Sequence, residues 1–228
     1  MRRALQPLFV RVEPSLASAY RFLSQPPAPN LWGDRDVEHS WVAAHIPLGP
    51  GSGLDFGSGN TNLSLVAVRR GLHMLATDRI AAPWSFEHPD FMFVQGDAFA
   101  LGLAPRSLDL IINCSTVEHL GLGRYGDPLD TDADLDGMQR LRDLLSPSGV
   151  MLLTIPVGVD TVMPKLHRIY GRQRLPRLLA GFSIAHCEFW VKNQANRWSL
   201  ADEQAALSLP PTLHSYALGC FVLRSAPE

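Results

Sequence analysis

Residues 54–63 have the composition of a ligand-binding turn. Leu54-Asp55-Phe56 leads into Gly57-Ser58-Gly59-Asn60, and an apolar stretch follows, so a strand, a glycine turn and a helix are expected in succession. Glycines let a ligand approach the backbone, and a helix start offers it unpaired N–H groups. A carboxylate at Asp55 would repel a pyrophosphate, so we expect these turn residues to bind a ligand that carries a cation.

Two further acidic residues end the next predicted strands. Asp78 lies about 20 residues beyond the turn, the spacing typical of a carboxylate that binds ribose hydroxyls. Asp97 is expected to accept from an adenine amino group, with the N–H of Ala98 or Phe99 donating back and the Phe99 ring lying on the purine. Together these positions predict an adenosyl ligand. Two strand-end neighbours complete the binding candidates, namely Arg79 and Cys114.

The elements that must position these residues alternate along the chain. Predicted strands cover residues 53–56, 73–77, 91–94, 108–114, 150–155, 183–191 and 216–224, with helices at 34–46, 60–68, 135–145 and 174–179. Asp34 and either Asn60 or Thr61 are expected to cap the first two helices. The pattern predicts an α/β fold: a doubly wound, mostly parallel, seven-stranded Rossmann-like sheet with an antiparallel C-terminal edge.

Composition narrows the class of protein. The chain has 228 residues, is 46% hydrophobic and has a formal net charge of −2, which does not suggest a nucleic-acid-binding surface. Three cysteines without CxxC spacing predict reduced thiols rather than a disulfide or zinc framework. No apolar run approaches the ~20 residues of a membrane span, and Arg11, Glu13 and Pro14 interrupt any signal-like start. We therefore expect a cytoplasmic protein, either a monomer or a homodimer.

Domain organisation is expected to be simple. Residues 1–30 contain a short helical stripe and then a proline-rich stretch, which predicts an N-terminal arm and linker. This arm is either partly ordered or a lid over a pocket. Residues 31–228 form the single predicted domain.

At this point the sequence resembles class I methyltransferases that depend on S-adenosyl-L-methionine (SAM). The matching motifs are Leu54-Asp55-Phe56-Gly57-Ser58-Gly59, the strand end at Asp78, Gly96-Asp97-Ala98 and Leu108-Asp109-Leu110-Ile111-Ile112-Asn113, with Leu144–Val150 similar to a further family segment. Thr61 replaces the usual third glycine of the turn. The tract 115–127 is similar to a poorly characterised bacterial branch connected with sugar, surface-glycan and metabolite tailoring. The resemblance implies methyl transfer from SAM to a small-molecule acceptor, most readily at oxygen.

Catalytic and acceptor-binding candidates cluster after the fourth strand and after the fifth. His119 is the leading candidate for a base, Glu118 is expected to orient it, and His167 is a possible second base. The alternative for each histidine is a structural role. The substrate candidates come from the tract 115–127 and from a basic segment, residues 165–177. Arginines bind anionic groups and tyrosines stack on rings, although a solvated face is the simpler interpretation of the basic segment. These candidates are Arg124, Tyr125, Arg168 and Tyr170.

Several other sites were weighed against this one. A divalent metal held by Glu118 and His119 is an alternative that is not favoured, because Ser115 stands where a further carboxylate is expected. A calcium loop starting at Asp130 lacks its required glycine and glutamate, so an acidic loop with Asp132 or Asp134 capping the next helix is the better interpretation. Dinucleotide binding fails at Asn62, where a glycine is needed. A non-catalytic adenosyl-binding module and a SAM-binding enzyme with non-methylating chemistry both stay open.

Overall fold

A computed structural model describes residues 33–212 and 215–226 of the chain. The predicted N-terminal arm, residues 1–30, lies outside these described residues, so its role as a lid stays a prediction. Within the described ranges, none of the helices is long and apolar enough to cross a membrane.

Short helices and strands alternate through most of the described chain. The helices are α2 (Asp34–His45), α3 (Leu63–Arg69), α4 (Ala133–Leu144), α5 (Arg174–Leu178) and α6 (Glu203–Leu207), with 3-10 turns η1 (Ala98–Ala100) and η2 (Val117–His119). The strands are β1 (Gly51–Phe56), β2 (Leu72–Asp78), β3 (Phe91–Gln95), β4 (Leu108–Cys114), β5 (Leu145–Val157), β6 (Thr161–Met163), β7 (His167–Ile169), β8 (Phe182–Lys192), β9 (Trp198–Ala201) and β10 (Ala217–Ser225).

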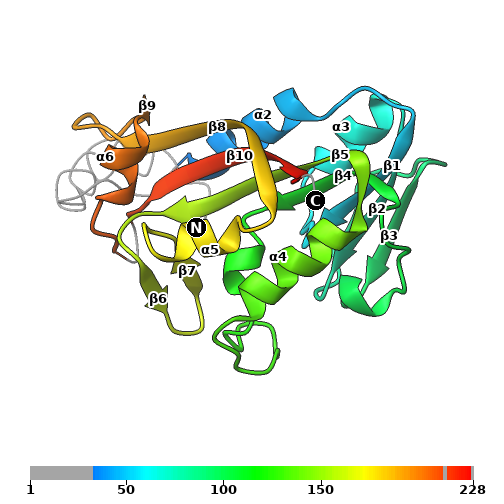
Figure 1. Cartoon of the computed structure of the whole chain (residues 1–228). Helices are drawn as coiled ribbons and strands as arrows, with labels where there is room; N and C mark the ends of the chain where they lie inside the picture. The colour runs from blue at the N-terminus through cyan, green and yellow to red at the C-terminus, as the bar shows by residue number, and fades with distance from the viewer. Residues whose placement is uncertain (1–32, 213–214, 227–228) are drawn as a thin grey trace, which may run out of the picture.

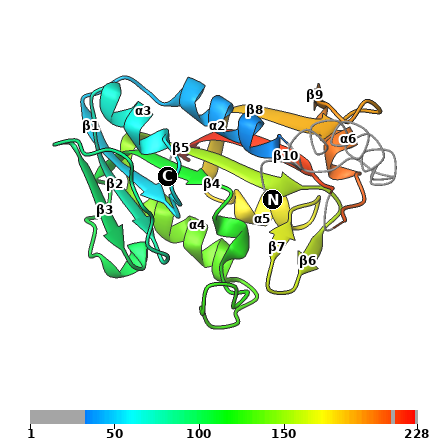
Figure 2. The same cartoon turned by 180° about the vertical axis from the view of Figure 1, so that it is seen from behind.

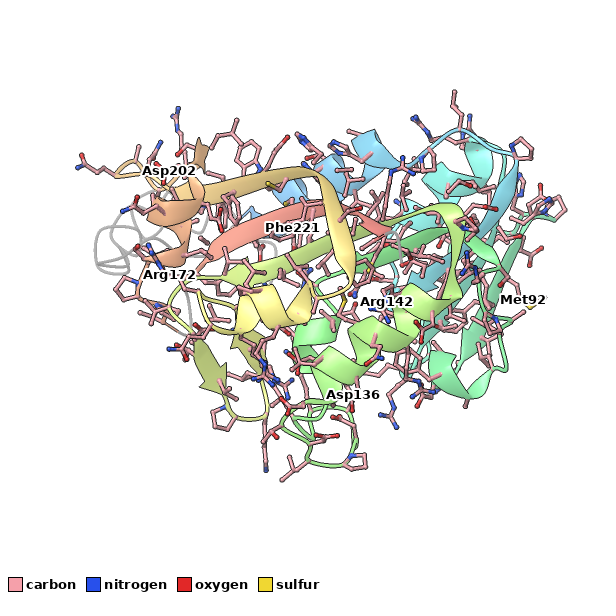
Figure 3. The ribbon with its side chains drawn as sticks, viewed as in Figure 1. Met92, Asp136, Arg142, Arg172, Asp202 and Phe221 are labelled. Atoms are coloured by element: carbon pink, nitrogen blue, oxygen red, sulfur yellow. The ribbon has the colours of Figure 1, made fainter. Side chains whose placement is uncertain are left out.

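One large sheet organises the fold, with the strand order β3-β2-β1-β4-β5-β10-β8-β9 (Figure 1). The first five of these strands pair in parallel, and β10 runs antiparallel to both β5 and β8. Figure 3 shows Met92, on β3, at one end of the molecule and Asp202, directly after β9, at the other. The predicted mostly parallel α/β fold with an antiparallel C-terminal edge is confirmed.

Helices cover both faces of this sheet, with α4 and α5 on one face and α2 and α3 on the other (Figures 1 and 2). Successive β4 residues face opposite sides, as the pleat requires. Ile111 packs in the core with α4 and α5, whereas Leu110 and Ile112 pack in the core with α2 and α3. Because both faces are covered, β4 and most of β5 are buried, which is why the sequence shows them as nearly continuous apolar runs.

The structure adds strands that the sequence did not predict. The large sheet has eight strands in the described chain rather than seven, because the Asn193 side chain accepts from the N–H groups of Ala195 and Arg197 and folds the chain back into β9. The basic segment after the fifth predicted strand, residues 165–177, contains β7, which pairs with β6 in a small antiparallel hairpin.

The predicted helix caps are wrong at two helices and correct in position at a third. Gly33, with φ +83°, stands at the N-cap of α2, so Asp34 is the first helical residue. Asn62 stands at the N-cap of α3 rather than Asn60 or Thr61. Asp132 occupies the N-cap position of α4 without a capping hydrogen bond. Capping depends on the exact residue at which the chain turns into the helix, which composition alone does not fix.

Candidate functional site

The strand order reverses between β1 and β4, since β2 and β3 extend the sheet on one side and β5 on the other. Ligands of open α/β sheets bind beyond the carboxyl ends of the strands at such a point. A cavity of about 420 Å³ lies there, within the size range of small-molecule sites. Its lining includes Phe56 and Gly57 from the end of β1 and Ser115 and Thr116 from the end of β4.

The glycine turn after β1 forms one wall of the cavity. Gly57 and Gly59 both have left-handed backbone conformations, with φ of +67° and +54°. A Cβ on Gly57 would lie 2.1 Å from Cγ2 of Thr116, so this glycine is needed for close packing against the β4 end. A Cβ on Gly59 would meet nothing within 4 Å, so its backbone borders open space. Asn60 continues this wall.

Asp78 ties the turn to the end of β2. Its Oδ2 accepts from the N–H of Gly59 at 2.9 Å, and its Oδ1 accepts from the N–H of Ile80 at 2.9 Å. Each carboxylate oxygen has a further lone pair, so the group keeps acceptor capacity toward the cavity that it lines. Arg79 follows it along the same wall.

The third predicted strand end forms the next part of the cavity. Asp97 accepts from the N–H of Phe99 at 2.9 Å and so caps η1. The Phe99 ring lies 5.3 Å from the ring of Phe56, and the guanidinium of Arg140 lies 4.0 Å from its centre. Ala98 completes this wall. Asp97, Ala98 and Phe99 therefore meet Asp78 and the glycine turn around one cavity, as the sequence predicted.

Three of the predicted cofactor-binding residues do not line the cavity. Asp55 is 2% exposed, and its Oδ2 accepts from Oγ of Ser64 at 2.7 Å, in the first turn of α3. Burial raises the pKa of Asp55 to about 7. Ser58 is buried, and Sγ of Cys114 lies 3.4 Å from Oγ1 of Thr154, with burial raising the pKa of the Cys114 thiol. The expected direct contact between Asp55 and a ligand is therefore not what this geometry provides.

His119 lines the cavity from η2 and is 9% exposed. Its Nδ1 lies 2.6 Å from the carbonyl oxygen of Leu166, so Nδ1–H donates to that oxygen and Nε2 carries the free lone pair. Arg124 donates to the same carbonyl at 3.1 Å. Burial, with a smaller contribution from the neighbouring charge of Arg124, lowers the pKa of His119 to about 4, so the imidazole is neutral near pH 7.

The other two predicted catalytic residues lie behind His119. Glu118 is 2% exposed, and its Oε1 is 3.7 Å from Nε2 of His119. Burial raises the pKa of Glu118 to about 8, and its Oε2 has no hydrogen-bond partner among the described residues. The His167 ring is centred 6.2 Å from that of His119, and burial lowers its pKa. Neither residue lines the cavity, so only His119 of the three is placed to meet a ligand directly.

Two predicted substrate residues are structural. Arg168 is 1% exposed and donates to the carbonyl oxygens of Leu120 and, at 2.9 Å, of Asp130, while its Nε lies 3.4 Å from Oδ1 of Asp134. Tyr170 is fully buried and donates its hydroxyl to Asp134 at 3.0 Å. This burial corrects the prediction that Arg168 and Tyr170 bind the acceptor.

The remaining two substrate candidates lie at the mouth of the site. Tyr125 lines the cavity and is 41% exposed, and the guanidinium of Arg124 is 5.3 Å from the centre of its ring. Asp127 also lines the cavity and holds this loop by accepting from the N–H groups of Gly123 and Tyr125, each at 3.1 Å. Sequence reasoning missed Asp127, Ser115, Thr116 and the stretch 80–83 as lining residues, although all of them directly follow strand ends or a motif that it had noticed.

A family model with the description "Caenorhabditis protein of unknown function, DUF268" matches residues 101–219, slightly more than half of the chain. The chain belongs to this family. In this DUF268 member the matched range contains β4, η2 and β5, and therefore His119, but begins after the glycine turn. No curated protein matches the sequence.

Solved structures with the same fold include several methyltransferases. The 1,6-didemethyltoxoflavin-N1-methyltransferase of Burkholderia thailandensis, solved with 1,6-didemethyltoxoflavin and S-adenosylhomocysteine, is 16% identical, with a TM-score of 0.58 over 96% of this chain and 89% of that one. A SAM-dependent methyltransferase from Archaeoglobus fulgidus is 14% identical, with a TM-score of 0.59 over 83% and 94% of the two chains. One from Mesorhizobium loti is 15% identical, with a TM-score of 0.54 over 81% and 95%. At these identities the likeness shows the fold, which is that of SAM-dependent methyltransferases.

Clusters of possible metal ligands were sought among the described residues. No group of three or more histidine, cysteine, aspartate or glutamate side chains in residues 33–212 and 215–226 is arranged to hold a metal ion. The Glu118–His119 pair therefore has no third described ligand beside it.

Proposed function

We propose that this protein is a SAM-dependent methyltransferase that acts on a small-molecule acceptor, with oxygen as the methylated atom. The observation that carries the proposal is the convergence of the glycine turn, Asp78 and Asp97 on one cavity at the switch point of the sheet. Three consecutive parallel strands end in residue types that suit an adenosyl amino acid. A non-specific pocket would have no need of this coincidence.

The residues around the cavity fit the parts of such a cofactor in order. We assign the wall at Gly57–Asn60 to its amino-acid part, because the glycine backbone leaves open space there. Asp78 retains acceptor capacity for the ribose hydroxyls. Asp97 and the Phe99 ring are assigned to the adenine, with Ile80 and Pro83 on the same apolar wall. Asp55 supports the turn from behind through Ser64.

Little covalent chemistry is required of the chain. When bound, SAM supplies an activated methyl group on a positively charged sulfur. The protein must align the acceptor and exclude water. His119 offers a neutral imidazole whose Nε2 lone pair is placed to take a proton from an acceptor hydroxyl, and the Leu166 carbonyl fixes the ring in that tautomer. Glu118, whose Oε1 lies 3.7 Å from Nε2, is assigned the role of orienting the ring.

The acceptor is assigned to the mouth of the site, beside Arg124 and Tyr125. A sugar or natural-product scaffold is the proposed class, and its support is the resemblance of residues 115–127 to a poorly characterised bacterial branch connected with such tailoring. A cytoplasmic location and a monomeric or homodimeric state belong to the same proposal.

Calorimetry with S-adenosylhomocysteine tests the cofactor assignment. We expect the wild-type protein to bind it and Asp78→Asn to bind at least about tenfold more weakly, because an amide offers one acceptor oxygen where the carboxylate offers two. Asp90→Asn, a partly exposed acid outside the cavity, is the matched control and should leave binding unchanged. No association in the wild-type protein, or equal affinity in Asp78→Asn, contradicts the proposal.

Turnover separates the remaining alternatives. A panel of hydroxylated acceptors incubated with SAM should yield S-adenosylhomocysteine in proportion to methylated product. Product formed while SAM stays intact would identify non-methylating chemistry. Binding without turnover of any acceptor would favour a non-catalytic module.

A further inference from the structure

A buried carboxylate from α2 lies one hydrogen bond away from the cavity. Glu38 is 1% exposed and has three donors around it. Its Oε2 accepts from Arg35 at 2.9 Å, and its Oε1 accepts from Oγ1 of Thr154 at 3.0 Å and from the hydroxyl of Ser115. Of these four residues, only Ser115 lines the cavity. Ser115 therefore connects the cavity to a carboxyl group that does not itself line the cavity.

The contact with Glu38 decides what the Ser115 hydroxyl can do. A serine hydroxyl has one proton and two lone pairs, and here the proton is donated to the carboxylate. The Ser115 N–H is also used, since it donates to the carbonyl oxygen of Thr154 at 2.9 Å. Toward the cavity, the Ser115 side chain is left with acceptor capacity alone. It therefore fits a ligand group that only donates hydrogen bonds, and an ammonium is such a group.

The backbone at Ser115 is held in an uncommon conformation. Its φ is +51°, in the left-handed region that costs energy for a residue with a Cβ. The conformation turns the chain directly after β4, where Thr116 packs against Gly57. Ser115 is thus one residue from the contact with the turn that the proposed function assigns to the amino-acid part of the cofactor, and it lines the same cavity as that turn.

Two other nearby carboxylates already accept hydrogen bonds from other groups of the protein. Asp55 is buried behind the turn, bonds to Ser64 and does not line the cavity. Asp127 lines the cavity, but its two oxygens accept from N–H groups of its own loop. Both carboxylates keep free lone pairs. Neither of them lines the cavity with a side chain whose donor is already used, as Ser115 does through its hydrogen bond to Glu38.

On the basis of the proposed function, we propose that Ser115, oriented by Glu38, receives the amino group of the methionine part of SAM. Glu38 is then a positioning residue that acts through Ser115. Replacing Glu38 by glutamine should reverse the arrangement. The glutamine oxygen would accept from Arg35, its amide nitrogen would donate to Ser115, and the serine proton would turn toward the ligand ammonium, where it repels.

The test compares two nucleosides by calorimetry in the full chain. S-adenosylhomocysteine carries the amino group, whereas 5′-methylthioadenosine lacks the whole amino-acid part. We expect Glu38→Gln to lower the affinity for S-adenosylhomocysteine about tenfold or more. The affinity for methylthioadenosine should stay within about twofold of the wild-type value. Ser115→Ala, at a partly exposed position, should cause a similar selective loss and serves if the buried substitution impairs folding. The double variant with Glu38→Gln and Ser115→Ala should bind S-adenosylhomocysteine as well as Ser115→Ala alone, because the Ser115 hydroxyl through which Glu38 acts is already absent.

Two more variants complete the design. Thr154→Val removes the other hydroxyl bonded to Glu38 without touching the cavity, so the preference for S-adenosylhomocysteine over methylthioadenosine should persist. Asp55→Asn tests the rival carboxylate. The inference is overturned if Asp55→Asn selectively loses affinity for S-adenosylhomocysteine while Glu38→Gln and Ser115→Ala do not. An equal loss of affinity for both nucleosides in Ser115→Ala overturns it too. A wild-type protein that binds neither nucleoside instead contradicts the proposed function itself.

Discussion

Asp134 should be among the most sensitive charged positions for stability. Its carboxylate is fully buried at the start of α4 and accepts from Nε of Arg174 at 2.9 Å and from the Tyr170 hydroxyl at 3.0 Å, with Nε of Arg168 at 3.4 Å. Asp134→Asn would leave the Arg168 charge buried without a counter-ion. Removing one partner of a buried pair costs about 3–5 kcal/mol.

The structure places the effect of Asp134→Asn at the lower end of that range. Arg168 keeps its bonds to the backbone carbonyls of Leu120 and Asp130, so part of its hydrogen bonding survives. We therefore expect a loss of about 3 kcal/mol in the free energy of unfolding. At about 2–4 °C per kcal/mol for a protein of this size, Tm should fall by about 6–12 °C.

Urea and thermal unfolding followed by circular dichroism would measure this loss. Asp132→Asn is the matched control, because that carboxylate is 49% exposed and lies 3.3 Å from Arg174 and 3.5 Å from Arg177. A surface pair of this kind contributes about 0–1 kcal/mol. If the two variants lose the same stability, the argument that burial makes the Asp134 network critical is refuted.

Four further outcomes are expected. His119→Gln should lower methyl transfer by about 10²–10⁴-fold while S-adenosylhomocysteine still binds in calorimetry. The pKa of His119 in the folded protein is lowered to about 4, so its contribution to the free energy of unfolding is present above about pH 6.5 and is lost as the pH falls toward 4. Over that interval, urea titrations should show a smaller loss of stability in His119→Gln than in the wild type. The folded pKa of Glu118 is raised to about 8, so its contribution is full below about pH 4.5 and is lost as the pH rises through 8, and the stability of Glu118→Gln should vary less there. Gly57→Ala should lower Tm more than Gly59→Ala, because only the first adds a Cβ that collides with Thr116; equal losses would count against the packing role of Gly57.

The sequence predicted much of the fold and of the cofactor wall because both depend on local patterns. Buried strands such as β4 show as apolar runs, and the residues that end parallel strands must meet at one sheet edge. Gly57, Asp78 and Asp97 therefore could be placed together without knowing any contact. The eighth strand was missed because it depends on a turn formed by the side chain of Asn193.

The acceptor side was harder to predict because it depends on contacts between residues far apart in the chain. Arg168 lies in a basic stretch that is typical of a solvated or anion-binding surface, yet its side chain points inward and donates to carbonyl oxygens of residues 120–131. Glu38 lies in an amphipathic helix and carries no motif, so nothing local marks it as a partner of Ser115.

The sequence by itself determined the order of strands and helices and which strand ends carry acids, since hydrophobic period and turn residues are local properties. Only the tertiary structure decided which of those side chains face the cavity. A carboxylate two residues before the first glycine of the turn can point toward the cavity or toward the next helix, and Ser64 of α3 turns Asp55 away. The packing of α2 and α3 on the sheet decided that Ser115 lines the cavity and Asp55 does not, because burial and hydrogen-bond partners depend on the whole fold.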